Sequence, residues 1–293
     1  MATLQEIRRR IASTQNTHKI TKAMEMVAAA KLRRAQQRIE ALRPYAVSMI
    51  DMLQDVATFA QGTEGYALLR RHKTIKNVSL VVFTGDGGLA GAFNANVIRR
   101  AVELEHTARA EGREVRWLVV GRKGIGTLRF RGYQMDRTWT GLSDHPEFVN
   151  AEDIASTVID LYSKEETDEV HLVYNRFRSP LEQTVEDVVR LPITLEEPAV
   201  ARAEHKVRAA YEYEPYPRTV FEGLLPRYVE IAVFRSLLES SASEQGARMT
   251  AMRNASENAI ELIDTYTLQL NRLRQASITQ EILEVVAGAN ALG

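Results

Sequence analysis

Apolar side chains recur with a helical period near the C-terminal end of the chain. From Ile231, alternating steps of three and four residues meet an apolar side chain at nine of thirteen positions, which is the pattern of a coiled-coil seam. The thirteen positions are Ile231, Phe234, Leu238, Ser241, Gln245, Arg248, Met252, Ala255, Ala259, Leu262, Tyr266, Gln269 and Leu273. Most exceptions fall in the small-residue run SSASEQGAR, where we expect a close helix–helix approach or an external contact.

The N-terminal end carries a matching but patchier stripe, made of Leu4, Ile7, Ile11, Ile20, Met24, Val27, Ile39 and Leu42. Both ends are almost free of helix breakers, since residues 1–43 contain no proline or glycine and residues 227–287 contain only Gly246. Proline costs about 3 kcal/mol inside a helix and glycine about 1 kcal/mol, so both ends are predicted to be long helices. A helix over 227–287 would span about 90 Å and needs support along its length, which antiparallel pairing of the two ends would supply.

The middle of the chain alternates between two kinds of pattern. Short apolar runs predict buried strands, and a fourth, less apolar run predicts an edge strand. The strands are expected at 78–84, 115–121, 169–175 and 182–191, with helices between them at 93–112 and 146–166. Strand–helix–strand alternation implies an α/β layered unit with largely parallel strands.

These elements predict an α/β fold class: a long antiparallel coiled coil of N- and C-terminal helices with an inserted Rossmann-like α/β domain. The expected segments are an N-terminal coiled-coil helix over 1–60, an α/β globular domain over 61–205 and a C-terminal coiled-coil helix over 206–293.

Composition adds mild limits. The chain has 293 residues, 38 basic and 38 acidic side chains and no cysteine, so it can form neither disulfides nor thiolate metal sites. The N-terminus lacks the apolar core of a signal peptide, and no 18 consecutive residues are apolar. We expect a chain that is soluble or at most peripheral to a membrane.

Two glycine-rich turns raise the possibility of a nucleotide site. Gly85-x-Gly87-x-x-Ala90 fits the dinucleotide fingerprint at a strand-to-helix turn, yet the second strand ends in Gly-Arg-Lys-Gly instead of an acidic residue. GRKGIGT, residues 121–127, has P-loop spacing, but Thr127 stands where the lysine belongs. Glycine turns that pack a helix against a strand explain both loops. A dinucleotide-binding enzyme stays as the alternative.

No other pattern indicates catalysis. The six histidines are scattered without HExxH or similar metal-ligand spacing, and no G-x-S-x-G elbow occurs. Paired carboxylates such as Glu165-Glu166 are typical of a solvated surface. We therefore predict no catalytic residue, no cofactor-binding residue, no cofactor and no metal site.

Charge is concentrated in the N-terminal helix, where residues 1–43 hold ten Lys/Arg against three Glu. Such a run is either a solvated helix face or a surface that meets an acidic partner, protein or nucleic acid. Nucleic acid would favour aromatic stacking residues among the charges, and none precedes Tyr45. A protein partner is favoured, and a basic coiled-coil nucleic-acid binder stays as a second alternative.

Four segments carry more specific motifs. ITQEILEVVAGANA, residues 278–291, resembles the signature of the gamma subunit of F-type ATP synthases, and every signature place is filled, by Ile278, Thr279, Glu281, Glu284, Gly288 and Ala289. ITKAMEMVAAAKLRRAQ (20–36) and YEYEPYP (211–217) are similar to further segments of that family. GDGGLAGAFN resembles its glycine turn, usually Ser-Asp-Arg-Gly-Leu-Cys-Gly-Gly-Phe-Asn, with Gly85, Gly87 and Ala90 replacing serine, arginine and cysteine.

The resemblance implies a function that the residues alone do not reach. In this family the paired terminal helices form the central rotor shaft inside a hexamer of alternating alpha and beta subunits. The α/β domain lies beside the epsilon subunit and the membrane c-ring. The shaft couples ion flow through that ring to ATP synthesis or hydrolysis on other subunits, so this chain would be a non-catalytic subunit. It would be peripheral at the cytoplasmic face of a bacterial plasma membrane, with no nucleic acid and no direct small-molecule ligand.

The resemblance also assigns partner contacts. Arg274, Gln275 and the signature residue Thr279 would belong to the tip that meets the surrounding ring. Met24, with Lys22 and Lys31, would face the lever segment of a catalytic subunit. Tyr213 and Glu214 would lie near the foot, toward the membrane ring. Each assignment has a simpler alternative. Met24 would pack in the seam of the helix pair, and Arg274 would be an arginine on a solvated helix surface.

Overall fold

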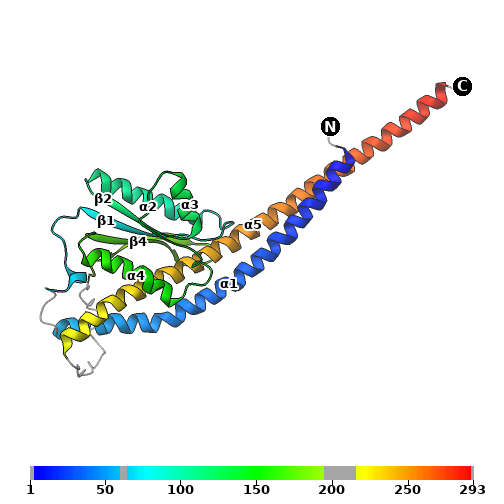
Figure 1. Ribbon diagram of the computed structural model, residues 1–293. Coiled ribbons are helices and arrows are strands. Elements are labelled where there is room, and N and C mark those ends of the chain that lie inside the picture. Colours follow the sequence, from blue (N-terminus) through cyan, green and yellow to red (C-terminus); the bar gives the residue numbers. More distant parts are fainter. Residues whose placement is uncertain (1–2, 60–64, 195–215, 292–293) are drawn as a thin grey trace. The chain divides into compact units, whose positions relative to one another are not determined.

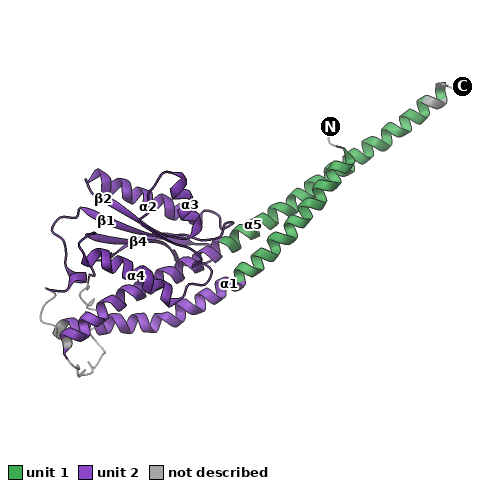
Figure 2. Ribbon diagram, viewed as in Figure 1, with its two compact units in different colours: residues 1–29, 248–293 green, residues 30–247 purple. Residues whose placement is uncertain are grey.

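The computed structural model describes residues 3–59, 65–194 and 216–291 (Figure 1). The chain forms two compact units, one of residues 1–29 with 248–293 and the other of residues 30–247 (Figure 2). Two long helices, α1 (Leu4–Phe59) and α5 (Pro217–Ala291), contribute to both units and continue through Pro44 and Pro226 respectively. The three segments 1–60, 61–205 and 206–293 stay a prediction.

The first unit is an antiparallel helix pair. Arg10 of α1 contacts Tyr266 of α5, Thr21 contacts Ser256, and Glu25 contacts Arg253. Partner numbers on α5 fall as those on α1 rise, so the two helices run in opposite directions. The predicted antiparallel coiled coil is confirmed.

The seam of this pair differs in detail from the predicted one. On α5, Met252, Ala259, Tyr266 and Leu273 are buried or half-buried as expected, but Leu262 is 46% exposed. The neighbouring positions in the observed seam are Ser256, Ile263 and Leu270. On α1, the predicted seam residues Ile20 and Val27 are 60% and 57% exposed.

Ile7 is buried as predicted, and the seam of α1 also buries Thr21, Glu25 and Ala28, which the apolar stripe did not include. Residues three and four positions apart lie on the same side of a helix. The apolar pattern alone therefore does not decide which of these residues form the seam. The small Ala28 allows close approach of the backbones, and the polar Thr21 and Glu25 have hydrogen-bonding partners across the seam.

The second unit is built on a five-stranded sheet in the order β3-β2-β1-β4-β5. The strands are β1 (Asn77–Phe83), β2 (Glu114–Val120), β3 (Arg137–Trp139), β4 (Glu169–Phe177) and β5 (Gln183–Leu191). The first four are parallel, and β5 is antiparallel to β4 at the edge. The four predicted strands are confirmed, and the three-residue β3 is too short to leave a pattern.

Helices cover both faces of the sheet (Figure 1). On one face, α2 (Phe93–Ala110) and α3 (Arg122–Phe130) pack on side chains such as Leu80 and Val82. On the other, α4 (Phe148–Ser163) packs with α1 and α5 segments of this unit on Val81 and Phe83. A short 3-10 helix, η1 (Ala67–Leu69), joins that second core. Burial on both faces explains why β1 is apolar at consecutive positions.

One helix was not predicted. The sequence of GRKGIGT predicts a glycine turn, yet Arg122–Phe130 is helical with Gly121 as its N-cap residue. Gly124 and Gly126 inside it are poor helix formers and obscured the pattern. Packing on the sheet stabilises the helix despite these glycines, since Ile125 and Leu128 are buried in the core beneath α2.

Candidate functional site

The glycine turn after β1 is organised by the carboxylate of Asp86. Its oxygens accept hydrogen bonds from the backbone N–H groups of Arg122 (3.1 Å) and Ser143 (3.2 Å), and the backbone of Gly141 is a further donor. Burial raises the pKa of Asp86, but these three backbone hydrogen bonds outweigh it and hold the pKa below the ordinary value. A carboxylate of this chain therefore occupies the first turn of α3, the kind of place where helix N-termini bind phosphate.

The glycines around this turn make room for close packing. A Cβ atom on Gly85 would lie 2.6 Å from Cδ of Glu244, and one on Gly121 would lie 2.1 Å from the carbonyl oxygen of Thr84. Gly121 also has φ of 97°, a left-handed conformation that favours glycine. The Thr84 hydroxyl donates to the Val120 carbonyl at 2.6 Å and accepts from the Gly124 N–H at 3.0 Å. Both glycine-rich loops thus have a packing role at the carboxyl end of the sheet.

A buried polar segment of α5 lies against this turn. Its buried polar residues are Ser236, Glu239, Ser240, Ser241, Ser243, Glu244 and Gln245. The Ser243 hydroxyl donates to the Asn175 carbonyl at 3.0 Å, and a Cβ on Gly246 would lie 3.4 Å from the Phe177 ring. The small residues of SSASEQGAR therefore allow close approach of α5 to the end of β4.

In the helix pair, the predicted contact Lys22 is already an ion-pair partner. Its ammonium lies 3.0 Å from Glu25, whose other oxygen accepts from Arg253 across the pair at 3.1 Å. The hydrogen bond from Lys22, opposed by burial and helped by Arg253, lowers the pKa of Glu25 below its ordinary value. The Lys22 side chain is still 53% exposed, and Met24 is half-buried beside it.

Lys31 lies in the second unit, where its ammonium contacts Asp144 Oδ2 at 3.0 Å. Arg274, Gln275 and Thr279 are exposed on α5 in the first unit, and the Thr279 hydroxyl donates to the Gln275 carbonyl at 2.9 Å. The structure therefore brings Lys22 and Met24 together on one stretch of α1, and the three tip residues together on one stretch of α5. Their partner roles stay predictions.

Two of the predicted contacts, Tyr213 and Glu214, lie outside the described residues.

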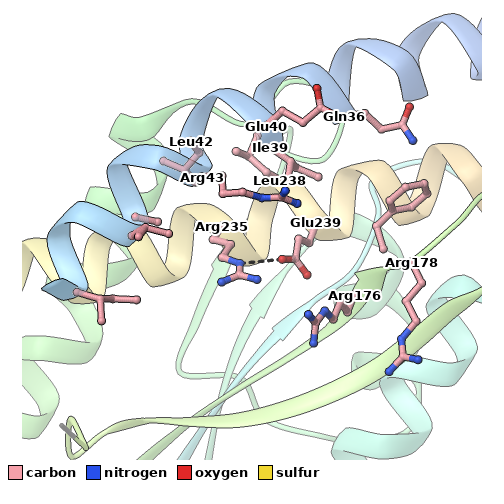
Figure 3. A pocket seen from close by; sticks show the side chains of 14 residues that line it. Gln36, Ile39, Glu40, Leu42, Arg43, Arg176, Arg178, Arg235, Leu238 and Glu239 are labelled. Atoms are coloured by element: carbon pink, nitrogen blue, oxygen red, sulfur yellow. Dashed lines mark hydrogen bonds and ion pairs between the residues drawn. The ribbon is translucent and has the colours of Figure 1, made fainter. Parts of the chain in front are cut away.

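Sequence reasoning missed a groove of about 360 Å³ between α1, β4 and α5 (Figure 3). Four arginines, Arg43, Arg176, Arg178 and Arg235, line it. The structure pairs Arg235 with Glu239 at 2.8 Å, Arg176 with Glu186 at 2.9 Å and Arg178 with Glu182 at 3.6 Å. Three of its cations thus have carboxylate neighbours in this chain. No local motif marks the groove, because its walls come from three separate parts of the sequence.

Comparison with known proteins identifies the family. The family model described as ATP synthase matches residues 3–292. The ATP synthase gamma chain of Moorella thermoacetica is 45% identical over 293 residues, covering 100% of both chains. That of Mycolicibacterium smegmatis is 42% identical over 305 aligned positions, covering 99% of this chain and 98% of the relative.

Solved structures agree with the sequence relatives. A chain from the central stalk/c-ring structure of the Tetrahymena thermophila mitochondrial ATP synthase aligns with a TM-score of 0.60 and 29% identity, covering 81% of this chain and 99% of that one. A chain of the Euglena gracilis mitochondrial ATP synthase rotor shares the fold, with a TM-score of 0.63 at 19% identity over 94% of this chain and 98% of that one. Because the match to gamma chains extends over the full length, this chain belongs to the ATP synthase gamma chain family.

Proposed function

We propose that this chain is the central rotor shaft of an F-type ATP synthase. In that role it couples ion flow through the membrane ring to ATP synthesis and hydrolysis at catalytic sites on other subunits. The observation that carries the proposal is the full-length match to gamma chains. The resemblance of the terminal and glycine-turn motifs to the same family supports it independently of the fold.

The helix pair suits the transmission of torque. Thr21 and Ser256 bind each other through their hydroxyls at 2.7 Å, and Glu25 binds Arg253 across the seam. Such directional contacts oppose sliding and rolling of one helix on the other, which apolar packing alone resists less because it is non-directional. A pair that turns as one body can pass rotation along its length.

The glycine turn supports a non-catalytic role. Asp86 and the backbone groups of Arg122 and Ser143 satisfy one another, and Glu244 fills the space beside Gly85. A phosphate group would have to displace a carboxylate that is already bound there. We therefore place the catalytic sites on other subunits and no cofactor on this chain.

The partners follow from the same role. We propose that the stem residues Lys22, Met24 and Lys31 face a catalytic subunit of the alpha/beta hexamer. The tip residues Arg274, Gln275 and Thr279 would meet the surrounding ring of subunits. Tyr213 and Glu214 would lie toward the membrane c-ring, with the epsilon subunit beside the α/β domain.

We also propose peripheral attachment at the cytoplasmic face of a bacterial plasma membrane. Among the described residues, none of the helices is both long and apolar enough to cross a bilayer. Attachment through other subunits is compatible with that finding.

Co-purification tests the proposed function. The tagged chain, expressed in its own cells, should leave the membrane in a large ATPase when peripheral proteins are stripped at low ionic strength. Its release should remove ATPase activity from the membrane in the same proportion. A chain recovered free of any ATPase, with membrane activity unchanged, would refute the proposal.

A further inference from the structure

The loop between β3 and α4 connects the α/β fold to both long helices through Asp144. One carboxylate oxygen, Oδ2, lies 3.0 Å from the ammonium of Lys31 on α1. The other oxygen, Oδ1, accepts a hydrogen bond from the side-chain amide of Gln245 on α5, also at 3.0 Å. A single carboxylate thus binds one helix with each of its oxygens.

The positions of these two partners along the helices are informative. All three residues belong to the second unit, which spans residues 30–247. Lys31 is the second residue of that unit on α1, and Gln245 is the third from its end on α5. Asp144 therefore binds both helices close to the two positions where each helix passes from the second unit into the first.

The loop itself is anchored to the sheet. The backbone N–H of Ser143 donates to Asp86 at 3.2 Å, and the Ser143 hydroxyl accepts from the Asp86 N–H at 2.9 Å. Asp86 follows β1, the central strand of the sheet. A further contact, from the Arg38 guanidinium to the Pro146 carbonyl, holds the other end of the loop on α1. The hydrogen bonds between Asp86 and Ser143, the peptide bond from Ser143 to Asp144 and the two hydrogen bonds of Asp144 therefore connect the turn after the central strand to both helices.

Burial shows which side of this connection is firmer. Gln245 is 1% exposed, so its amide is held in a fixed place within α5. The Lys31 and Asp144 side chains are 42% and 62% exposed, and an exposed ion pair contributes little to stability. The arrangement is thus better suited to fixing direction than to holding the fold together.

We propose that Asp144 is a positioning residue for torque transfer, which locks α1 and α5 to the α/β domain so that rotation of the domain is delivered to both helices together. The inference rests on the proposed rotor function and adds a residue that no family motif identified above contains. It also gives Lys31 a role within this chain, beside the contact with a catalytic subunit that the family resemblance implies.

The test uses the reconstituted complex and a rotation probe attached to one introduced cysteine, His106→Cys, on the exposed side of α2. With the complex arrested by an inhibitory nucleotide, the angular spread of the probe reports the torsional stiffness between the domain and the held helices. Asp144→Ala removes both arms of the connection, whereas Lys31→Gln removes only the arm to α1. The matched control is Asp160→Ala, which removes an exposed carboxylate of α4 whose ion-pair partner is Lys164, the C-cap residue of the same helix.

The expected order of angular spread is Asp144→Ala widest, Lys31→Gln intermediate, and Asp160→Ala equal to the parent. The charge-reversed pair Lys31→Glu with Asp144→Lys should narrow the spread relative to Asp144→Ala, because it restores the arm to α1. If Asp144 had a purely structural role, its variants would lower the thermal midpoint of the isolated chain without producing this order of angular spread. If Asp144→Ala does not assemble, the angular spread of Lys31→Gln is compared with that of Asp160→Ala, and the proposal requires the former to be wider.

Unchanged spread in every variant, in complexes whose parent rotates with ATP, would overturn the role of Asp144 and leave the proposed function standing. A parent probe that does not rotate with ATP would refute the proposed function itself.

Discussion

The two units of the chain are stabilised in different ways. Residues 30–247 enclose two hydrophobic cores, one on each face of the sheet, with large side chains such as Phe83, Tyr162 and Phe221 fully buried. The helix pair of the first unit buries a single row of mostly small or polar residues, and its C-terminal stretch exposes Ile278, Ile282, Leu283, Val285 and Val286. Contiguous exposed apolar side chains mark surfaces that partners cover. The comparison teaches that the second unit is held by its own apolar cores, whereas the first leaves apolar side chains exposed on a single pair of helices.

Core truncation should give the largest contrast between the units. Phe83→Ala in the second unit removes a fully buried ring and should lower the free energy of unfolding of the isolated chain by about 3–5 kcal/mol. Leu283→Ala, at a side chain that is 62% exposed, should change it by no more than about 0.5 kcal/mol. Urea unfolding of both variants measures the difference. Equal losses would contradict the comparison.

Replacing glycine by alanine should lower the stability of the chain at one position and raise it at another. Gly85→Ala places a Cβ 2.6 Å from Cδ of the buried Glu244 and should cost about 1–3 kcal/mol. The control is Gly126→Ala, a helical position in α3 with nothing within 4 Å of the new Cβ, which should gain about 0.5–1 kcal/mol. Thermal or urea unfolding measures both changes. If Gly85→Ala were as stable as the parent, the Glu244 side chain would have to move aside at no cost. That result would contradict a packing role for Gly85.

The seam of the helix pair should depend on one hydroxyl more than on the other. The Thr21 hydroxyl donates to the His18 carbonyl at 3.1 Å and so accepts from Ser256. Thr21→Val leaves the Ser256 hydroxyl buried without that acceptor, at a cost of about 1–3 kcal/mol. Ser256→Ala leaves Thr21 its bond to His18 and should cost less, and the double variant should recover part of the loss. Helical circular dichroism during unfolding measures the series, and equal effects of the two single changes would contradict this assignment.

The smallest expected effect is a pH dependence from the second unit. The pKa of Asp86 lies below its ordinary value of 3.8, so the folded state binds a proton there less readily than the unfolded state. Its contribution to stability is full above the ordinary value and is lost as pH falls from there through the folded pKa. Asp86→Asn should therefore make the acid side of the stability curve shallower, and Asp160→Asn serves as the exposed control. Parallel acid curves for Asp86→Asn and the parent would refute the role of this carboxylate.

The fold was predictable where one local rule dominates. Long stretches without proline or glycine predicted the two helices, and consecutive apolar residues predicted the parallel strands, because both faces of the sheet are covered. The failures occurred where packing overrides local preference. Helix α3 forms despite Gly124 and Gly126, since Ile125 and Leu128 are held in the core. The seam uses Thr21 in place of Ile20 because the hydroxyl has a partner on the other helix.

The candidate site was predictable only in part. The motifs that mark the family lie in continuous segments, so the sequence identifies them directly. The hydrogen bonds of Asp86 and Asp144 join residues far apart in the chain, from Lys31 to Gln245, and no local pattern indicates such contacts. The partner contacts proposed for Lys22 and Arg274 would depend on surfaces of other subunits, so a single chain does not specify them.

Rotation of the helix pair as one body is the central claim, and disulfide cross-linking in the assembled complex tests it most directly. The chain has no cysteine, so an introduced pair is the only source of a bridge within it. Thr21→Cys with Ser256→Cys, where the two native hydroxyl oxygens lie 2.7 Å apart, ties the two helices to each other. Lys22→Cys with a cysteine in a facing loop of a catalytic subunit, at a Cα separation below about 7 Å, ties the shaft to the ring.

The account predicts that the first bridge leaves ATP hydrolysis largely intact, because both helices turn together. The second bridge should stop multi-turnover hydrolysis, and reductant should restore it. Full hydrolysis with the second bridge completely formed would contradict the rotor function.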